Sequence, residues 1–268
     1  MQEAPLKRAR EPLPTRVQDL PPLPTTYART LDAGLEALDL DLDRRVRDAI
    51  DSHVRLLLAW TASVNLTAIR DPEAAARLHV LDSLAALPLI RARGASQLLD
   101  IGSGGGFPGL PLAAAIPADR ALLVDSVGKK VSFLETAIAA TGLADRATAI
   151  KARVESVAHD TAQRGAWPIV TARAVASLWD LVELALPLVA PGGVLVAWKR
   201  EPLGPELKAA GPALAALRAG RVELVSVPVP GLGSHRLVVV PRGGDIDARY
   251  PRDPVERRRH PLRSAPGG

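Results

Sequence analysis

The stretch Leu98-Leu-Asp-Ile-Gly-Ser-Gly-Gly-Gly-Phe-Pro-Gly109 decides the fold of this chain. A short apolar run ends at an aspartate and passes directly into a loop with five glycines in eight residues. Because glycine has no Cβ, the backbone of such a loop can approach a ligand closely, and a helix that follows points its amino end at the same place. The stretch predicts a ligand site between a buried strand and a helix. A merely flexible loop is the alternative.

Short apolar runs alternate with helical stretches from residue 97 onward. We expect strands at 97–101, 121–125, 147–150, 169–172, 194–198, 222–227 and 237–240, and helices at 128–141, 178–189 and 206–219. Repeated strand, helix and strand is typical of an open parallel sheet covered on both faces. No long helix separates the last two strands, which indicates an antiparallel hairpin at one edge. The sequence therefore predicts an α/β, Rossmann-like, mostly parallel seven-stranded sheet.

The chain divides into four segments by composition. Residues 1–26 hold six prolines and few large apolar groups, so we expect a disordered leader. Residues 27–93 have apolar positions at helical spacing, and Asp71-Pro-Glu73 is typical of a capped helix start, which predicts an N-terminal helical layer packed on the core. The Rossmann-like domain spans 94–242. The basic tail, 243–268, either folds onto the site and contacts phosphates or stays solvated.

Composition excludes several classes of site. The 268 residues include no Cys, which excludes disulfides, Cys-ligated zinc, iron–sulfur clusters and thiol nucleophiles, and the five His form no metal-binding pair. A net charge of +5 moderately favours polyanionic partners, while only eight aromatic residues argue against an open stacking platform for RNA. No apolar stretch approaches the ~18 residues of a membrane span or the core of a signal peptide. We therefore expect a cytoplasmic protein without a membrane segment.

The glycine loop fits two ligands. Gly104, Gly106 and Gly109 match G-x-G-x-x-G, and Asp125 follows Gly106 by 19 residues, close to the spacing in a dinucleotide site. However, the turn begins two residues before this match, and Asp100 stands at the strand tip. A carboxylate there repels a pyrophosphate but favours the ammonium and sulfonium of S-adenosylmethionine, whose ribose hydroxyls Asp125 would then bind. The alternative is that both carboxylates cap loop amides.

Longer motifs carry a resemblance to a family. They are Asp100-Ile-Gly-Ser-Gly-Gly-Gly-Phe-Pro-Gly-Leu-Pro-Leu112, Leu123-Val-Asp-Ser-Val-Gly-Lys-Lys-Val-Ser-Phe-Leu134, Arg173-Ala-Val-Ala-Ser-Leu178, Asn65-Leu-Thr-Ala-Ile69 and His79-Val-Leu-Asp-Ser-Leu84. With them the chain resembles the bacterial ribosomal RNA small-subunit methyltransferase G family, also called GidB. The resemblance implies a class I S-adenosylmethionine-dependent methyltransferase that modifies N7 of a guanine in the decoding-region loop of 16S rRNA. We expect a monomer that acts on 16S rRNA or the small ribosomal subunit and binds no DNA.

The resemblance also implies functional residues. Together with Gly104 of the loop, the expected cofactor contacts are Gly102, Phe107, Asp125, Ser126, Val154, Glu155 and Arg173. Glu155 either accepts from the adenine amine or is solvated, and Arg173 serves the methionine carboxylate or the target nucleotide. The expected RNA contacts are Lys129, Lys130, Lys199 and Arg200, with Lys199 also a candidate substrate contact. For Lys129 and Lys130 a solvated helix face is the alternative, and we expect His79 to be packed between the helical layer and the sheet.

Guanine N7 carries a free lone pair, so the implied reaction needs no general base, and we assign no catalytic acid or base. Three other functions are alternatives. A nicotinamide-dependent reductase lacks the Tyr-x-x-x-Lys pair it would need. A non-catalytic RNA- or cofactor-binding module need not keep Arg173. A methyltransferase of the same fold acting on a small molecule or a protein is the nearest alternative.

Overall fold

A single mixed sheet forms the centre of the molecule. The computed structural model describes residues 13–117 and 119–264. Its sheet has seven strands in the order β3-β2-β1-β4-β5-β7-β6, with β1 to β5 parallel and β7 antiparallel to both β5 and β6. The strands are β1 (Gln97–Ile101), β2 (Arg120–Asp125), β3 (Ala147–Lys151), β4 (Trp167–Arg173), β5 (Val189–Arg200), β6 (Glu223–Ser226) and β7 (His235–Pro241). The predicted α/β sheet with an antiparallel hairpin at its edge is confirmed.

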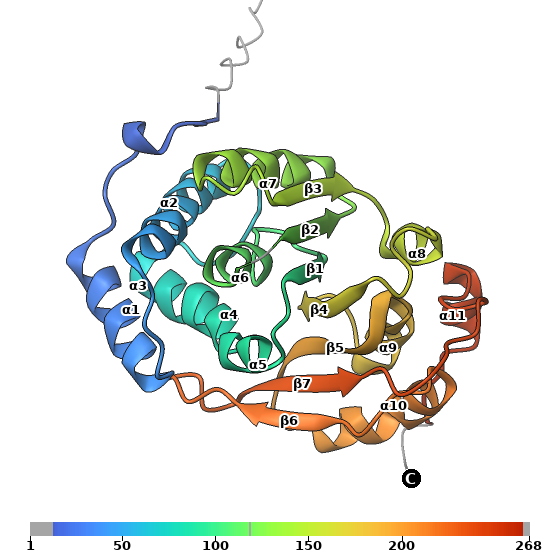
Figure 1. The fold of residues 1–268 in the computed structure, drawn as a ribbon. Helices are drawn as coiled ribbons and strands as arrows, with labels where there is room; N and C mark the ends of the chain where they lie inside the picture. The colour runs from blue at the N-terminus through green and yellow to red at the C-terminus, as the bar shows by residue number, and fades with distance from the viewer. Residues whose placement is uncertain (1–12, 118, 265–268) are drawn as a thin grey trace, which may run out of the picture.

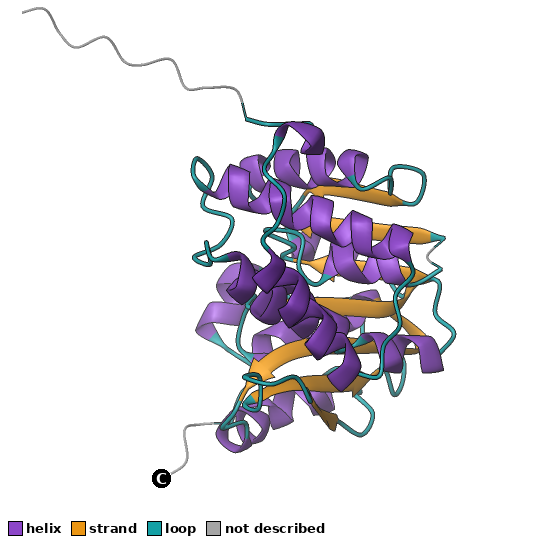
Figure 2. Cartoon of the chain, turned by 90° about the vertical axis from the view of Figure 1, so that its left-hand side faces the viewer, coloured by secondary structure: helices purple, strands orange, loops and turns teal. Residues whose placement is uncertain are grey.

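Helices cover both faces of this sheet (Figure 1). On one face lie the N-terminal layer and the first two crossover helices: α1 (Thr25–Ala37), α2 (Arg44–Thr61), α3 (Pro72–Ala75), the π-helical η2 (Ala76–Leu81), α4 (Asp82–Leu84), α5 (Leu87–Ala92), α6 (Gly109–Ala115) and α7 (Gly128–Ala140). On the other lie α8 (Val154–His159), α9 (Leu178–Ala185), α10 (Gly204–Ala216) and α11 (Pro254–Arg259). Figure 2 shows the N-terminal helices in front of the strands. No helix in the described part is long and apolar enough to cross a membrane.

Side chains that alternate along the strands form two hydrophobic cores, one on each face of the sheet. Successive strand side chains point to opposite faces, so Leu98 and Leu123 join the core under the N-terminal layer, whereas Leu99 and Val124 join the core under α8, α9 and α10. All four side chains are fully buried, and each Leu contributes about 1.5–3 kcal/mol by burial. A parallel strand covered on both faces is mostly apolar, which is why Leu98, Leu99 and Ile101 of β1 precede the glycine loop.

Element ends differ from the prediction by one to three residues in most elements and by more between α9 and β5. The helix expected at 178–189 stops at Ala185, and a single 3₁₀ turn, η3 (Leu186–Leu188), connects it to β5. Strand β5 begins at Val189 and is twelve residues long, much longer than the expected 194–198. Pro187 stands in the 3₁₀ turn, where its missing N–H would break a continued α-helix.

The predicted disordered leader is wrong for its described part. Residues 13–24 lie along α2, and a short 3₁₀ turn, η1, spans Val17–Asp19. Trp60 Nε1 donates to the carbonyl of Pro14 at 2.7 Å, and the Arg55 side chain donates to the carbonyls of Val17 and Pro21, both at 2.9 Å. Prolines lack a donor but keep their carbonyl, so a proline-rich segment can be fixed by donors from a distant helix. Residues 1–12 lie outside the described residues.

The C-terminal segment packs against the sheet's second helical layer. Arg252 donates from Nε and Nη2 to the two carboxylate oxygens of Glu183 in α9, both at 2.8 Å, and Tyr250 is buried in the same core. Glu183 is only 2% exposed, so this fork replaces the water that the carboxylate loses. The alternative of a solvated end is therefore wrong for 243–264, whereas the last four residues lie outside the described part.

Candidate active site

The glycine loop turns the chain from β1 into α6. Gly102, Gly104 and Gly106 have positive φ angles of 67°, 54° and 85°, where a Cβ costs about 1–2 kcal/mol. A Cβ on Gly102 would lie 2.7 Å from Val175 Cγ2, and one on Gly106 would lie 2.8 Å from His53 Nε2. A Cβ on Gly104 would meet nothing closer than the Gly102 carbonyl oxygen, at 3.8 Å. The loop therefore opens on one side, beside Gly104, into free space.

Asp125 at the end of β2 holds this loop in place. Its Oδ2 accepts from the Gly104 backbone N–H at 2.9 Å, and its Oδ1 accepts from the Val127 N–H at 2.8 Å. The carboxylate is nearly buried, and Lys130 Nζ approaches to 3.9 Å. Each carboxylate oxygen has a further lone pair. Capping the loop and binding a pair of hydroxyls are thus compatible functions of this one side chain.

Asp100 is buried near the end of β1. It is 1% exposed, its Oδ1 accepts from Thr171 Oγ1 at 2.7 Å, and a Cβ on Gly109 would lie 2.8 Å from its Oδ2. Burial raises the pKa of this carboxyl to about 6. Asp100 lies in the wall of neither cavity described below. Its carboxylate packs against Gly109 at the start of α6.

Two adjoining cavities run along the carboxyl ends of the parallel strands. The smaller has a volume of about 400 Å³ and the larger about 540 Å³. They share Gly102, Lys130 and residues 174–176 and so form one cleft. The cleft lies where the strand order reverses between β1 and β4, the usual ligand position in open α/β sheets. Ala174, on the boundary, has a left-handed φ of 56°, a strained conformation that is concentrated at functional sites.

The smaller cavity brings together residues from the ends of β2 and β3. Asp125, Ser126, Val154 and Glu155 all line it, as the sequence predicted for one ligand. Glu155 is not free: its Oε1 accepts from Arg257 Nη2 at 2.6 Å, and its side chain is 15% exposed. The wall therefore combines a carboxylate that can face a diol, a second carboxylate at the far end, and an apolar side chain between them.

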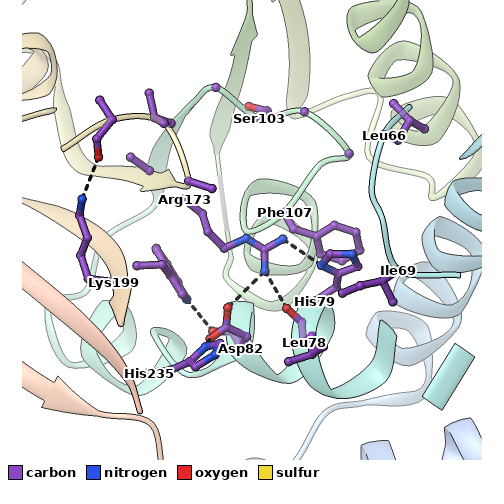
Figure 3. A pocket seen from close by; sticks show the side chains of 18 of the residues that line it. Leu66, Ile69, Leu78, His79, Asp82, Ser103, Phe107, Arg173, Lys199 and His235 are labelled. Atoms are coloured by element: carbon purple, nitrogen blue, oxygen red, sulfur yellow. Dashed lines mark hydrogen bonds and ion pairs between the residues drawn. The ribbon is translucent and has the colours of Figure 1, made fainter. Parts of the chain in front are cut away.

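Arg173 is the centre of the larger cavity (Figure 3). Its Nη1 donates to the Leu78 carbonyl at 3.0 Å and to Asp82 Oδ2 at 3.2 Å, and its Nη2 donates to His79 Nδ1 at 3.2 Å. The other oxygen of Asp82 contacts His235 Nδ1 at 2.8 Å. Leu78 and His79 belong to η2, and such π-helical turns are frequent at functional sites. Asp82 thus neutralises a cation that faces the cleft.

Phe107 and His79, which line this cavity, belong to a stack of three rings whose third member is the buried His53. The Phe107 ring lies between His53, at a centroid distance of 4.3 Å, and His79, at 4.8 Å. Since a guanidinium only donates, His79 Nδ1 accepts from Arg173, which leaves the ring proton on Nε2 to donate to Thr67 Oγ1 at 2.8 Å. Burial and the nearby Arg173 lower the pKa of His79 to about 3, and burial lowers that of His53 to about 4. Both imidazoles are neutral at pH 7.

Comparison with known proteins identifies the family. The model of the GidB family, described as rRNA small subunit methyltransferase G, matches residues 47–229. The chain belongs to the GidB family. It is 40% identical over 216 residues to the ribosomal RNA small subunit methyltransferase G of Roseiflexus sp. (strain RS-1), covering 81% of this chain and 92% of that protein. It is 35% identical over 239 residues to the protein of the same name from Pelotomaculum thermopropionicum, covering 89% of this chain and all of that protein.

Solved structures support the fold of this GidB chain. An O-methyltransferase from Bacillus cereus in complex with SAH superposes with a TM-score of 0.53 at 16% identity, covering 80% of this chain and 99% of that one. The methyltransferase SibL in its apo form gives a TM-score of 0.50 at 16% identity, covering 81% and 75%. The predicted class I methyltransferase fold is confirmed.

Only some of the expected RNA contacts of the GidB chain line the cleft. Lys130 lines both cavities, exposed Arg200 lines the larger, and exposed Lys129 lines neither. Lys199 lines the larger cavity, but its Nζ donates to the Ala176 carbonyl at 2.8 Å and to Glu206 Oε1 at 2.7 Å. Two of its three N–H donors therefore connect the 174–176 segment to α10.

Three side chains at this GidB cleft were not predicted. Asp82 stands in a quoted motif three residues after His79, so its spacing could have suggested a shared helical face. Trp198 Nε1 donates to the Asp82 carbonyl at 2.7 Å, and His235 reaches the Asp82 carboxylate from β7. His235 is 153 residues away in sequence, so no local pattern indicates this contact. We expected His79 to be packed between the helical layer and the sheet, and its exposure of 9% agrees with this.

Proposed function

We propose that this chain transfers the methyl group of S-adenosylmethionine to N7 of a guanine in the decoding-region loop of 16S rRNA. The observation that carries the proposal is the two-part cleft, because one cavity suits a nucleoside and the adjoining one suits a second flat molecule. Membership of the GidB family supports the ribosomal RNA substrate. The nearest alternative is a small-molecule or protein substrate in the larger cavity.

The smaller cavity fits the adenosine part of S-adenosylmethionine. Asp125 has lone pairs left for the ribose hydroxyls, and Glu155 can accept from the exocyclic amine of adenine. Ser126 and Val154 lie in the same wall. The open side of the loop at Gly104 leaves room for the methionine part to pass toward the larger cavity. When bound, S-adenosylmethionine supplies an electrophilic methyl group on a sulfonium.

The positive charge of Arg173 in the larger cavity is compensated. Arg173 alone would disfavour a sulfonium nearby, but Asp82 pairs with it, and the rings of His53 and His79 are neutral. The guanidinium of Arg173 has five N–H donors. Its hydrogen bonds to Leu78, Asp82 and His79 leave some of these donors free. The remaining donors serve the methionine carboxylate or the target nucleotide.

In the proposed reaction the protein positions the reacting atoms and transfers no proton. Guanine N7 has a lone pair on the major-groove edge and attacks without first losing a proton. Aligning N7, the methyl carbon and sulfur can contribute up to ~7–11 kcal/mol. The base must leave its stack to enter the larger cavity, which His79 and Phe107 line. This mechanism needs no acid, base or metal, and the described residues hold no cluster of metal ligands.

The rim of the cleft provides candidate RNA contacts. Lys130 and Arg200 lie at the cavities, and Lys129 is exposed beside them on α7. Such cations bind phosphates without regard to sequence and release counterions. We propose that the chain acts in the cytoplasm as a monomer, on 16S rRNA or the small ribosomal subunit.

Methyl transfer to defined RNA tests this proposal. The purified protein is incubated with tritiated S-adenosylmethionine and small-subunit RNA or particles from a strain that lacks the modification. Strand scission at base-labile 7-methylguanine should give one new cleavage in the decoding-region loop. If the protein binds S-adenosylmethionine but no label enters RNA, the RNA substrate is refuted and the small-molecule or protein substrate is favoured.

A further inference from the structure

The C-terminal segment forms part of the wall of the smaller cavity. Helix α11 lies beyond the range 47–229 matched by the family model, yet its residue Arg257 lines the cavity beside Asp125 and Glu155. Figure 1 shows α11 beside α8 at the edge of the second helical layer. Arg257 is 9% exposed, whereas the next residue in the same helix, Arg258, is exposed. Of these two neighbouring arginines, Arg257 points into the cavity and Arg258 points to solvent.

Arg257 balances an acidic cluster at this end of the cleft. Its Nη2 donates to Glu155 Oε1 at 2.6 Å, and its Nη1 lies 3.5 Å from Asp180 Oδ1. Burial raises the pKa of Asp180, and Arg257 acts in the opposite direction. The neighbouring Glu183 is already paired with Arg252. Without Arg257, the carboxylates of Glu155 and Asp180 would face each other with no cation between them.

The pair also fixes where the Glu155 carboxylate points. Glu155 is the second residue of the short helix α8, and a glutamate side chain loses up to about 1.5–2 kcal/mol of rotamer entropy when held in one position. The other cation near it, Arg153, is 66% exposed with its Nε 3.7 Å away, too far for a hydrogen bond. Arg257 is thus the group that holds Glu155 toward the cavity.

We propose that Arg257 is a positioning residue for S-adenosylmethionine: it orients Glu155, which binds the adenine amine, and makes α11 an integral part of the cofactor site. This inference rests on the proposed function. It predicts that the C-terminal segment, and not only the glycine loop, determines cofactor affinity. Arg257 itself acts through Glu155 and takes no part in methyl transfer.

Calorimetric titration with S-adenosylmethionine tests the inference. Arg257→Gln should weaken binding about tenfold, with kcat at saturating cofactor unchanged, while the matched control Arg258→Gln should bind as the unmodified chain does. Affinity for 5′-methylthioadenosine, which lacks the methionine part, should fall by the same factor. The double variant Glu155→Gln with Arg257→Gln should bind no more weakly than Glu155→Gln alone, because both changes remove one interaction.

The outcomes separate the inference from the proposed function. If the unmodified chain does not bind S-adenosylmethionine, the proposed function fails. If it binds, and Arg257→Gln binds equally well while Glu155→Gln is weakened, the inference is overturned. Thermal unfolding checks that Arg257→Gln is folded. If it is not, Arg257→Lys, which keeps the charge but loses the planar fork, should show intermediate affinity, and unchanged affinity would again overturn the inference.

Discussion

Gly104→Ala separates the cost of backbone strain from the cost of obstructing the ligand. Gly104 has a φ of 54°, and an added Cβ would meet no atom closer than 3.8 Å, so the methyl group clashes with nothing in the free protein. The remaining cost is the left-handed backbone, about 1 kcal/mol of unfolding free energy. Gly94 is the matched control, because it has a φ of 59°, no atom within 4 Å of its added Cβ, and no place in the cleft.

Both variants should therefore lose about the same stability in urea, about 1 kcal/mol. Only Gly104→Ala should lose S-adenosylmethionine affinity, by at least about tenfold, because its methyl group enters the space we assign to the cofactor. Calorimetric titration measures both affinities. If Gly104→Ala binds the cofactor as tightly as Gly94→Ala does, the path of the ligand along the glycine loop is refuted.

Three further predictions concern the walls of the cleft. Asp125→Ala should abolish detectable cofactor binding in calorimetry while thermal unfolding stays cooperative; unchanged affinity contradicts the ribose assignment. Asp82→Asn should lower the unfolding free energy in urea by about 3 kcal/mol, because it leaves the buried Arg173 without a counter-charge, and a loss well below about 1 kcal/mol argues against that pairing. The pKa values of His53 and His79, about 4 and about 3, lie below the ordinary 6.5, so below pH 6.5 the unfolded chain binds more protons and stability should fall from pH 7 to pH 5. His79→Phe should reduce that fall by about 2 kcal/mol in urea titrations at the two pH values, and an unaltered pH dependence contradicts a neutral His79.

The mostly parallel sheet with its antiparallel edge could be predicted because the deciding signals are local. Apolar runs separated by helical stretches give parallel strands, and the lack of a helix between the last two gives a hairpin. The place of β7 between β5 and β6 was not predicted, since the pairing of Val239 with Val196 joins residues far apart in sequence. The sequence also did not predict that residues 13–24 take up a fixed position, because that position depends on hydrogen-bond donors of Arg55 and Trp60 in α2.

The site could be predicted only where its residues follow strand ends. Gly102 follows β1 directly, Asp125 is the last residue of β2, and Glu155 lies four residues after β3, so sequence position alone places them at one edge of the sheet. Residues that complete the site from other layers carry no such signal. His235 arrives from the antiparallel hairpin, and Arg257 from a tail whose net charge suggested only RNA phosphates or solvent.

A crystal structure of the protein with S-adenosylhomocysteine tests the central claim most directly. The account predicts adenosine in the smaller cavity, with ribose hydroxyls at Asp125 and the adenine amine at Glu155, and with the sulfur at the passage that opens toward Phe107 and Arg173. The larger cavity should stay free for the guanine. Adenosine in the larger cavity, or density outside the cleft, would contradict the division of the cleft into a cofactor half and a base half.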